Sequence, residues 1–485
     1  MSETGLPRDR RALVAIDLGA ESCRVSLLRW HGDEPEIRLL HRIRNGPVKD
    51  GNHLRWPLGQ ILSGIEEGLR IAAEAAPEGI RSIAVDGWAV DYVRLDHNDR
   101  AIQSPFCYRD ERTVTAKDHA ETLLASKELF TQTGAQPLRI NTLYQLVADQ
   151  QAGFNPTTPW MLLPEYVLHW LGGRRVAEYT NATHTGLVDL TTGEWSPALF
   201  ERLGLAIEAA APIVPAGAHL GKIKGELARL PAFAETELIA PACHDTASAI
   251  AAIDEEMEHV AYIVSGTWSL VGTVVPKPIN GPEALKDGFT NQGAAGGGYC
   301  FHTNVNGMWL LKQCLDDWCT RGRNVDLATL IAAAEEVDDL PARIDVDAPP
   351  LILAGEMPSR INDELRRKGF DPIEDVPGNE LVFARVIFAS LADRYASVLR
   401  NLESLTGRDF RRITILGGGS RNLLLKRLTE ASTGLPVSAG LAEGSTVGNF
   451  AVQLASWDAA ASPNGPKMPE LVRSWAARLE ERCPV

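Results

Sequence analysis

The chain has no long apolar run, no paired-cysteine motif and no basic patch. Among its 485 residues, no stretch approaches the roughly 20 apolar residues that span a bilayer. Residues 1–8 lack the apolar core that a secretion signal needs. The seven cysteines are scattered, odd in number and without a Cys-x-x-Cys pair, which excludes a regular disulfide framework and favours reduced thiols. We therefore expect a cytoplasmic protein with no membrane segment.

The chain also has fewer basic than acidic residues. Lys and Arg number 48 against 63 Asp and Glu, so the formal net charge is −15. A net-acidic body does not attract nucleic acid or an anionic membrane surface, and neither is expected as a partner. Hydrophobic content of 45% and charged content of 23% are ordinary for a globular protein, and this length corresponds to roughly two or three domains.

Two familiar phosphate-binding motifs are absent as well. No Gly-x-x-x-x-Gly-Lys-Ser/Thr sequence occurs, which excludes a P-loop, and no Gly-x-Gly-x-x-Gly follows a predicted strand, which excludes the dinucleotide fingerprint. The chain instead contains two similar strand–turn–strand patterns. The first has strands at 12–16 and 23–30, and the second has strands at 260–264 and 270–275.

Each pattern is followed later by a helix and then a strand that ends in a glycine-containing turn. The first half has an amphipathic helix at 58–75 and a strand at 81–85, and the second half has a helix at 380–405 and a strand at 413–416. This weak internal repeat predicts two similar α/β domains with a ligand cleft between them. We place the boundary at the acidic segment near Glu255, giving domains 1–254 and 255–485.

A single carboxylate, Asp245, stands where a short predicted strand at 237–240 gives way to a helix of small residues. Asp is a favoured N-cap residue, so a purely structural role is one interpretation. The other is that Asp245 faces a ligand at the edge of the cleft. The phosphate-binding candidates elsewhere in the chain favour the second interpretation.

The turn that follows the first strand contains Asp17 and Gly19. Its backbone amides can hold phosphate oxygens, and Asp17 can bind Mg²⁺, which prefers carboxylate and water ligands. Taken alone, this segment is equally typical of an ordinary hairpin. The turn at 265–269 offers the same geometry from the second half, and glycines 417–419 can admit a base or ribose close to the backbone.

With these features in view, the chain resembles the FGGY carbohydrate kinases of the actin and sugar-kinase superfold, most closely their rhamnulokinase branch. The similarity extends over roughly residues 12–455. Eight ordered segments carry it: 16–20, 86–91, 108–110, 141–145, 178–183, 244–249, 265–269 and 416–419. The resemblance implies an α/β fold in which two ribonuclease-H-like domains flank an interdomain cleft.

The resemblance also implies an ATP-dependent transfer of the γ-phosphoryl group to the primary hydroxyl of a ketose. Asp245 would accept the proton of that hydroxyl, and Asp17 would hold Mg²⁺. The residues expected at the sugar are Trp88, Ala89, Arg109, His244, Thr246 and Asn304. Those expected at ATP are Ala20, Glu21, Ser22, Cys23, Arg24, Thr267, Lys312 and Gly418. The partners implied are a small ketose and ATP, with a homodimer as a further expectation.

Some residues depart from the pattern of that branch. Ala89 replaces a sugar-contacting Gly, Lys312 replaces an ATP-contacting Gln, and Glu21 and Cys23 replace smaller residues in the first phosphate turn. L-rhamnulose is the ketose expected, with L-fuculose, L-xylulose or a related ketose as alternatives. A non-catalytic ATP-binding protein of the same superfold is the alternative from another functional class.

Overall fold

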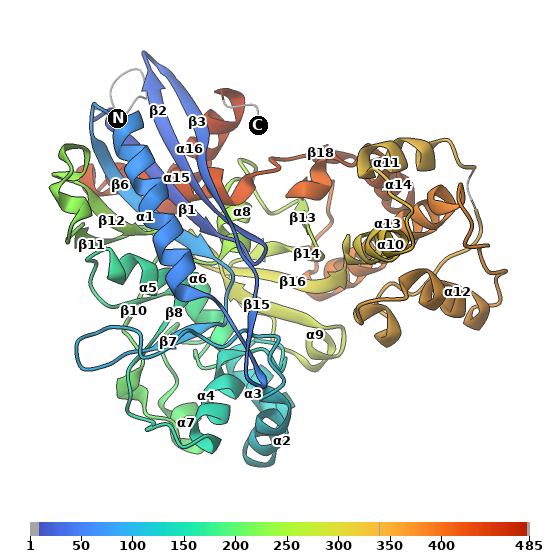
Figure 1. Cartoon of the computed structure of the whole chain (residues 1–485), viewed down its shortest axis with the longest axis horizontal. Helices are drawn as coiled ribbons and strands as arrows, with labels where there is room; N and C mark the ends of the chain where they lie inside the picture. The colour runs from blue at the N-terminus through green and yellow to red at the C-terminus, as the bar shows by residue number, and fades with distance from the viewer. Residues whose placement is uncertain (1–8, 339, 483–485) are drawn as a thin grey trace.

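The computed structural model describes residues 9–338 and 340–482, and Figure 1 shows two mixed sheets with helices packed on them. The first sheet has the order β11-β12-β6-β1-β2-β3. Its strands are β1 (Ala12–Leu18), β2 (Ser22–His31), β3 (Glu34–Arg44), β6 (Ile80–Gly87), β11 (Ala218–Lys222) and β12 (Glu237–Ala240). The two sheets are similar in strand number and connection, as the repeated sequence pattern predicts.

The second sheet has the order β15-β16-β14-β13-β17-β18. Its strands are β13 (Val260–Ser265), β14 (Trp268–Val275), β15 (Phe289–Gly293), β16 (Tyr299–Asn306), β17 (Arg412–Leu416) and β18 (Val437–Ala439). In each sheet the hairpin strands pair antiparallel, and the first hairpin strand pairs parallel with a strand from much later in the chain. Both predicted hairpins are confirmed.

The centre of the first domain forms because β1 is apolar on both faces. All seven residues of β1 are buried, as expected for a strand that is covered on both sides. Helix α1 (Leu58–Ala75), predicted at 58–75, packs its stripe of Ile61, Ile65 and Leu69 against the sheet. Helix α5 (Leu163–Trp170) covers β6, and α8 (Asp245–Ala251) follows β12 directly.

Residues 88–236 add short elements to the first domain. The strands are β7 (Tyr92–Arg94), β8 (Trp160–Leu162), β9 (Ala177–Glu178) and β10 (Ile213–Val214), and the small hairpin β4 (Val48–Asp50) and β5 (His53–Arg55) precedes them. The helices are α2 (Thr113–Leu123), α3 (Ser126–Thr133), α4 (Thr142–Gln151), α6 (Tyr179–Ala182) and α7 (Pro197–Arg202), with a 3₁₀ turn η1 (Thr183–Thr185). Buried residues of these elements, without the β4–β5 hairpin, form an apolar cluster separate from that of the first sheet.

The long helix α13 (Glu380–Thr406) organises the second domain. Its buried face carries Phe383, Ile387, Leu391 and Tyr395, and Gly407 ends it in a left-handed conformation with φ of 67°. The remaining helices there are α9 (Pro282–Lys286), α10 (Trp309–Thr320), α11 (Leu327–Glu335), α12 (Met357–Arg367) and α14 (Leu423–Thr433), with the turn η6 (Gly418–Arg421). The predicted helix at 380–405 is confirmed.

The end of the chain returns to the first domain. Helices α15 (Gly444–Ala461) and α16 (Met468–Arg482) share an apolar cluster with Leu13 and Ala15 of β1, and in Figure 1 they lie beside the first sheet. Helix α15 also packs on α8 so closely that a Cβ at Gly448 would stand 1.7 Å from the Ser248 carbonyl oxygen. The division at 254/255 remains a prediction, and this packing crosses it.

Candidate active site

Asp245 is the first residue of α8, and its side chain is 35% exposed. His244, in an extended conformation, occupies the N-cap position, so Asp245 is not itself the cap. The Thr246 hydroxyl donates to Asp245 Oδ1 over 3.1 Å, and His244 Nε2 lies 3.3 Å from the same oxygen. The carboxylate is thus held from its own helix turn and remains open to a ligand.

Asp245 belongs to a group of three carboxylates with Asp17 and Asp86. Asp17 on β1 and Asp86 on β6 are paired in register, and both are buried. Burial, and then the charge of Asp17, raise the pKa of Asp245 to about 7 and hold the pKa of Asp86 well above its ordinary value. Acids that repel one another in this way are typical of a site that receives a cation or a proton.

The partners of Asp86 leave one of its oxygens free. The Asn449 amide of α15 donates to Oδ2 over 2.6 Å, whereas the buried Oδ1 has no hydrogen-bond partner. Within the described part of the chain, no group of three or more His, Cys, Asp or Glu side chains is arranged to hold a metal ion. A cation here would therefore depend on few protein oxygens.

Arg24 connects the first turn to the start of α15. Its guanidinium donates to Asp17 over 2.8 Å and to Glu443 over 2.5 Å, and the Ser445 hydroxyl donates to Asp17 over 2.6 Å. Asp17 is thus bound by two donors that come from opposite ends of the sequence. The sequence analysis did not identify Glu443, Ser445 or Asn449, and the glycine-rich run at 444–448 is the signal that marks this helix start.

The first turn has the close backbone approach that its glycine predicts. A Cβ at Gly19 would stand 2.5 Å from the Ser22 carbonyl oxygen. Ala20 and Ser22 are half-buried and Glu21 is exposed. Cys23 is fully buried in the first core, where burial raises the pKa of its thiol to about 12, so only its backbone can face a phosphate.

His244 is joined by a residue that the sequence analysis did not single out. The rings of His184 and His244 lie 3.9 Å apart, and His184 Nδ1 is 3.0 Å from the Gln292 amide nitrogen of β15. Burial lowers the pKa of His244 to about 3, so its imidazole is neutral. The ring centres of Trp88 and Trp56 lie 4.3 Å apart with their planes tilted by 40°, and Ala89 is 9% exposed.

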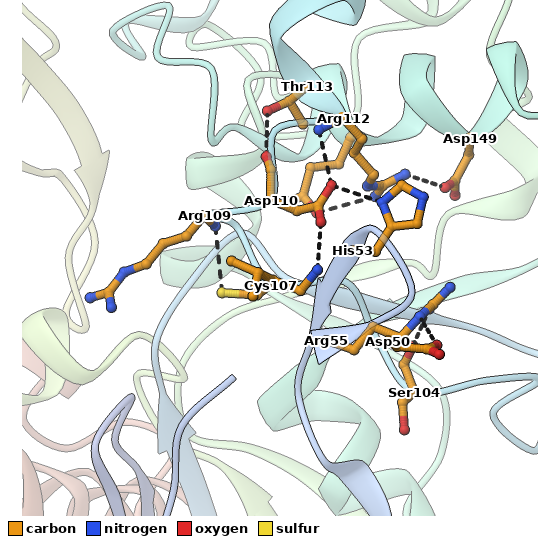
Figure 2. A network of polar contacts seen from close by, with 12 residues as sticks. Asp50, His53, Arg55, Ser104, Cys107, Arg109, Asp110, Arg112, Thr113 and Asp149 are labelled. Carbon is orange, nitrogen blue, oxygen red and sulfur yellow. Dashed lines mark hydrogen bonds and ion pairs between the residues drawn. The ribbon is translucent and has the colours of Figure 1, made fainter. Parts of the chain in front are cut away.

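Arg109 stands beside a rigid polar network, shown in Figure 2. Asp110 accepts from the backbone amides of Leu54 (2.6 Å) and Arg112 (2.9 Å), which fixes the loop that carries Arg109. The Arg109 side chain is exposed, passes 5.3 Å from the centre of the Tyr108 ring and points away from this network (Figure 2). It is therefore available to a ligand.

The other predicted residues lie in the second domain, and their contacts are local. The Thr267 carbonyl accepts from the Trp309 amide over 3.0 Å, and Lys312 pairs with Asp316 of the same helix over 3.1 Å. Asn304 on β16 and Gly418 on η6 are exposed. The predicted site residues up to Thr246 thus lie in the first domain and those from Thr267 onward lie in the second. A site between domains requires residues from both.

A pocket of about 690 Å³ opens elsewhere, between the start of α1, residues 98–104 and α5. Its lining includes Arg100, Tyr166 and Trp170 and none of the predicted site residues. The three carboxylates Asp17, Asp86 and Asp245 therefore remain the candidate catalytic site.

Among the described residues, no helix combines the length and the hydropathy of a membrane-spanning segment.

Two similar α/β domains with glycine-containing turns after their central strands, and acids at the ends of β1 and β6 in the first of them, fit a two-domain phosphotransferase. Comparison with known families makes the class specific. Residues 12–252 match the N-terminal domain of the FGGY family of carbohydrate kinases, and residues 261–457 match its C-terminal domain. The chain belongs to this family and is a sugar kinase, and the kinases of this family use ATP.

Individual relatives refine this result. The chain is 32% identical to the rhamnulokinase of Ligilactobacillus salivarius (strain UCC118) over 447 residues, which cover 92% of this chain and 90% of that protein. Two solved structures from Lactobacillus acidophilus share the fold at 14% sequence identity. Each match covers 98% of this chain and 96% of the other chain. They are a xylulose kinase with a TM-score of 0.77 and a gluconate kinase with a TM-score of 0.75. The predicted family and fold class are confirmed.

Proposed function

We propose that this protein transfers the γ-phosphoryl group of ATP to the primary hydroxyl of L-rhamnulose, forming L-rhamnulose 1-phosphate. The observation that carries the proposal is Asp245, an accessible carboxylate whose pKa is raised to about 7 at the edge of a group of acids. The similarity to a rhamnulokinase over most of the chain supports the choice of ketose.

In the proposed reaction, Asp245 accepts the proton of the sugar hydroxyl as the hydroxyl oxygen attacks the terminal phosphorus of ATP, and ADP leaves. A group with a pKa near the working pH is efficient in this role, because it is ionised and still basic enough to take the proton. The neutral ring of His244 and the Thr246 hydroxyl, both in contact with the Asp245 carboxylate, orient it.

The remaining residues divide between the two substrates. Trp88, Ala89, Arg109 and Asn304 are proposed to contact the sugar. Residues 20–24, Thr267, Lys312 and Gly418 are proposed to contact ATP, with Cys23 acting through its backbone. For this role Arg24 must share its charge between Asp17, Glu443 and the phosphates.

The acids at the ends of β1 and β6 fit a magnesium ion. The Asp17 carboxylate and the unpartnered Oδ1 of Asp86 are hard oxygen ligands, and a cation would offset the effects of burial and of the Asp17 charge, which raise the pKa of Asp86. Mg²⁺, when bound, would neutralise phosphate charge. We propose Asp17 as its principal ligand and Asp86 as the second.

A panel of ketoses tests the substrate. We expect kcat/KM for L-rhamnulose to exceed that for L-fuculose and L-xylulose by about tenfold or more, because a pocket distinguishes single methyl or hydroxyl groups by about 1–3 kcal/mol. A higher value for either competitor would reassign the substrate. ATP hydrolysis that no sugar stimulates would instead support the non-catalytic alternative. A homodimer stays a prediction, which sedimentation velocity checks.

Replacing the proposed base tests the site. Asp245→Asn should lower kcat by about 10²–10⁴ while ADP binds within a few-fold of the parent. Asp363→Asn, on the exposed face of α12, removes a carboxylate of the same size and serves as the matched control. Near-parental turnover by Asp245→Asn would show that the base is another residue.

A further inference from the structure

A buried carboxylate from a distant part of the chain holds the backbone that leads into Asp245. Glu178, at the end of β9, accepts from the Cys243 backbone amide over 2.8 Å and from the Thr180 hydroxyl over 2.5 Å. The Thr180 hydroxyl in turn accepts from the His244 backbone amide over 3.3 Å. Glu178, Thr180 and Cys243 are all completely buried.

The two amides held in this way belong to the two residues immediately before Asp245. They lie between the end of β12 and the first turn of α8, where the only other backbone pairing described is an isolated parallel bridge to Gly87 of β6. Their position determines where α8 starts and hence the direction in which the Asp245 carboxylate points. Small shifts there matter, because misplacing a reacting group by about 1 Å can cost about 10²-fold in rate.

The segment that carries Glu178 is itself anchored on two sides. Beneath it, the Glu178 backbone amide donates to the buried Glu165 carboxylate over 3.0 Å. On the other side, the Thr183 hydroxyl accepts from the Gly293 amide of β15 over 2.8 Å. The support for the 243–244 backbone is therefore anchored on α5 in the first domain and on β15 of the second sheet.

We propose that Glu178, acting with the Thr180 hydroxyl, is a positioning residue that aims Asp245 at the sugar hydroxyl. The inference rests on the proposed role of Asp245 as the base. Glu178 touches neither substrate, and its effect passes through the backbone of Cys243 and His244. A role of this kind affects the chemical step more than the binding of ATP.

Glu178→Gln and Thr180→Val test this. Thr180→Val removes the hydroxyl that joins Glu178 to the His244 amide. Glu178→Gln has one acceptor oxygen where Glu178 has two, so it loses either the bonds from the Cys243 amide and the Thr180 hydroxyl or the bond from the Thr180 backbone amide, because the glutamine amide nitrogen cannot accept. We expect kcat to fall by about 10- to 100-fold with KM for ATP within about threefold of the parent. Thr180→Ser, which keeps the hydroxyl, should restore most of the lost rate.

Thr185→Val is the matched control. Thr185 is equally buried and lies in the same segment, but its hydroxyl donates to the Ala182 carbonyl and does not reach residues 243–244. We expect this variant to keep kcat within about threefold of the parent. An equal loss of kcat in Thr185→Val and Thr180→Val would mean that the segment acts only through general packing, and would overturn the proposal.

The double variants Glu178→Gln/Asp245→Asn and Thr180→Val/Asp245→Asn separate this inference from the proposed base. If Glu178 acts through Asp245, each double variant should be no slower than Asp245→Asn alone. A single Asp245→Asn variant with parental turnover would overturn both proposals. An impaired Asp245→Asn beside a folded Glu178→Gln or Thr180→Val of parental kcat would overturn the positioning role alone. If one of these variants does not fold, the other carries the test.

Discussion

Asp17 and Asp86 lie opposite each other on the neighbouring parallel strands β1 and β6, both buried and both acidic. Two carboxylates so placed cannot both be ionised without a compensating charge. Arg24 and Ser445 compensate Asp17, and Asn449 supports Asp86, whose pKa stays well above its ordinary value. After burial, the charge of Asp17 is the main cause that raises the pKa of Asp245.

The activity should depend on the ionisation of Asp245. Because the base must be ionised, kcat/KM should fall about tenfold per pH unit as the pH drops below about 7, where the pKa of Asp245 lies. A pH series with saturating ATP and limiting ketose measures this. If kcat/KM instead fell only near the ordinary pKa of an aspartate, the pKa of Asp245 would not be raised by its surroundings.

Arg24 lowers the pKa of Asp245, while burial and Asp17 raise it. Arg24→Gln removes the positive charge, so the acid limb of kcat/KM should move to higher pH, whereas Arg24→Lys should leave it near its parental position. Arg24→Gln also releases Glu443 from its ion pair. Superimposable pH profiles for the two variants would contradict the electrostatic role.

Asp86→Asn tests the proposed metal site. Asparagine has the shape of a protonated aspartate and can still accept from Asn449, so the folded state should tolerate it. The free Mg²⁺ needed for half-maximal activity should rise several-fold, since an anionic ligand is lost. Titrating the activity with Mg²⁺ in a chelator-treated enzyme measures the change. An unaltered Mg²⁺ requirement would remove Asp86 from the proposed ligands.

Glu165 should make the protein less stable as the pH rises. Burial raises the pKa of Glu165 to about 8 from the ordinary glutamate value of 4.5, so between these values the folded state holds a proton that the unfolded chain releases. The free energy of unfolding therefore loses this contribution as the pH rises through that window. In urea unfolding at pH 5 and pH 8, Glu165→Gln should show a smaller decrease than the parent.

The exposed acid Glu194 provides the control for that measurement. Glu194→Gln should retain the parental dependence on pH. The Asn181 side chain, whose Oδ1 has no partner, can turn its amide to meet the introduced glutamine, so Glu165→Gln is expected to fold. An identical decrease in the parent and in Glu165→Gln would show that Glu165 does not release its proton on unfolding in this range.

Two glycines of α15 should respond differently to alanine. At Gly448 the new Cβ would stand 1.7 Å from the Ser248 carbonyl oxygen, so α15 and α8 must separate, at a cost of about 3 kcal/mol. At Gly444 the nearest atom is 3.5 Å away, and alanine should be neutral or stabilising by up to about 1 kcal/mol. Denaturant unfolding of both variants checks this, and equal stabilities would contradict the close packing of the two helices.

Local sequence patterns determined much of the architecture. The stripe of Ile61, Ile65 and Leu69 predicted α1 with its observed ends, and the apolar run before Asp245 predicted β12. Both hairpins were likewise apparent, because an apolar run, a polar turn with glycine and a second apolar run follow one another directly in the sequence. Asp245 was identified because a strand and a helix adjoin at that residue.

What only the tertiary structure decided is which distant residues support those turns. Ser445 reaches Asp17 across more than 400 positions, and Glu178 reaches Cys243 across 65. A hydrogen bond between such residues leaves no periodic trace in the sequence, because it depends on how whole elements pack. The sequence by itself determined the two repeated α/β halves and the acid at the start of α8, and the return of α15 to the first sheet and the support beneath Asp245 came from the three-dimensional packing.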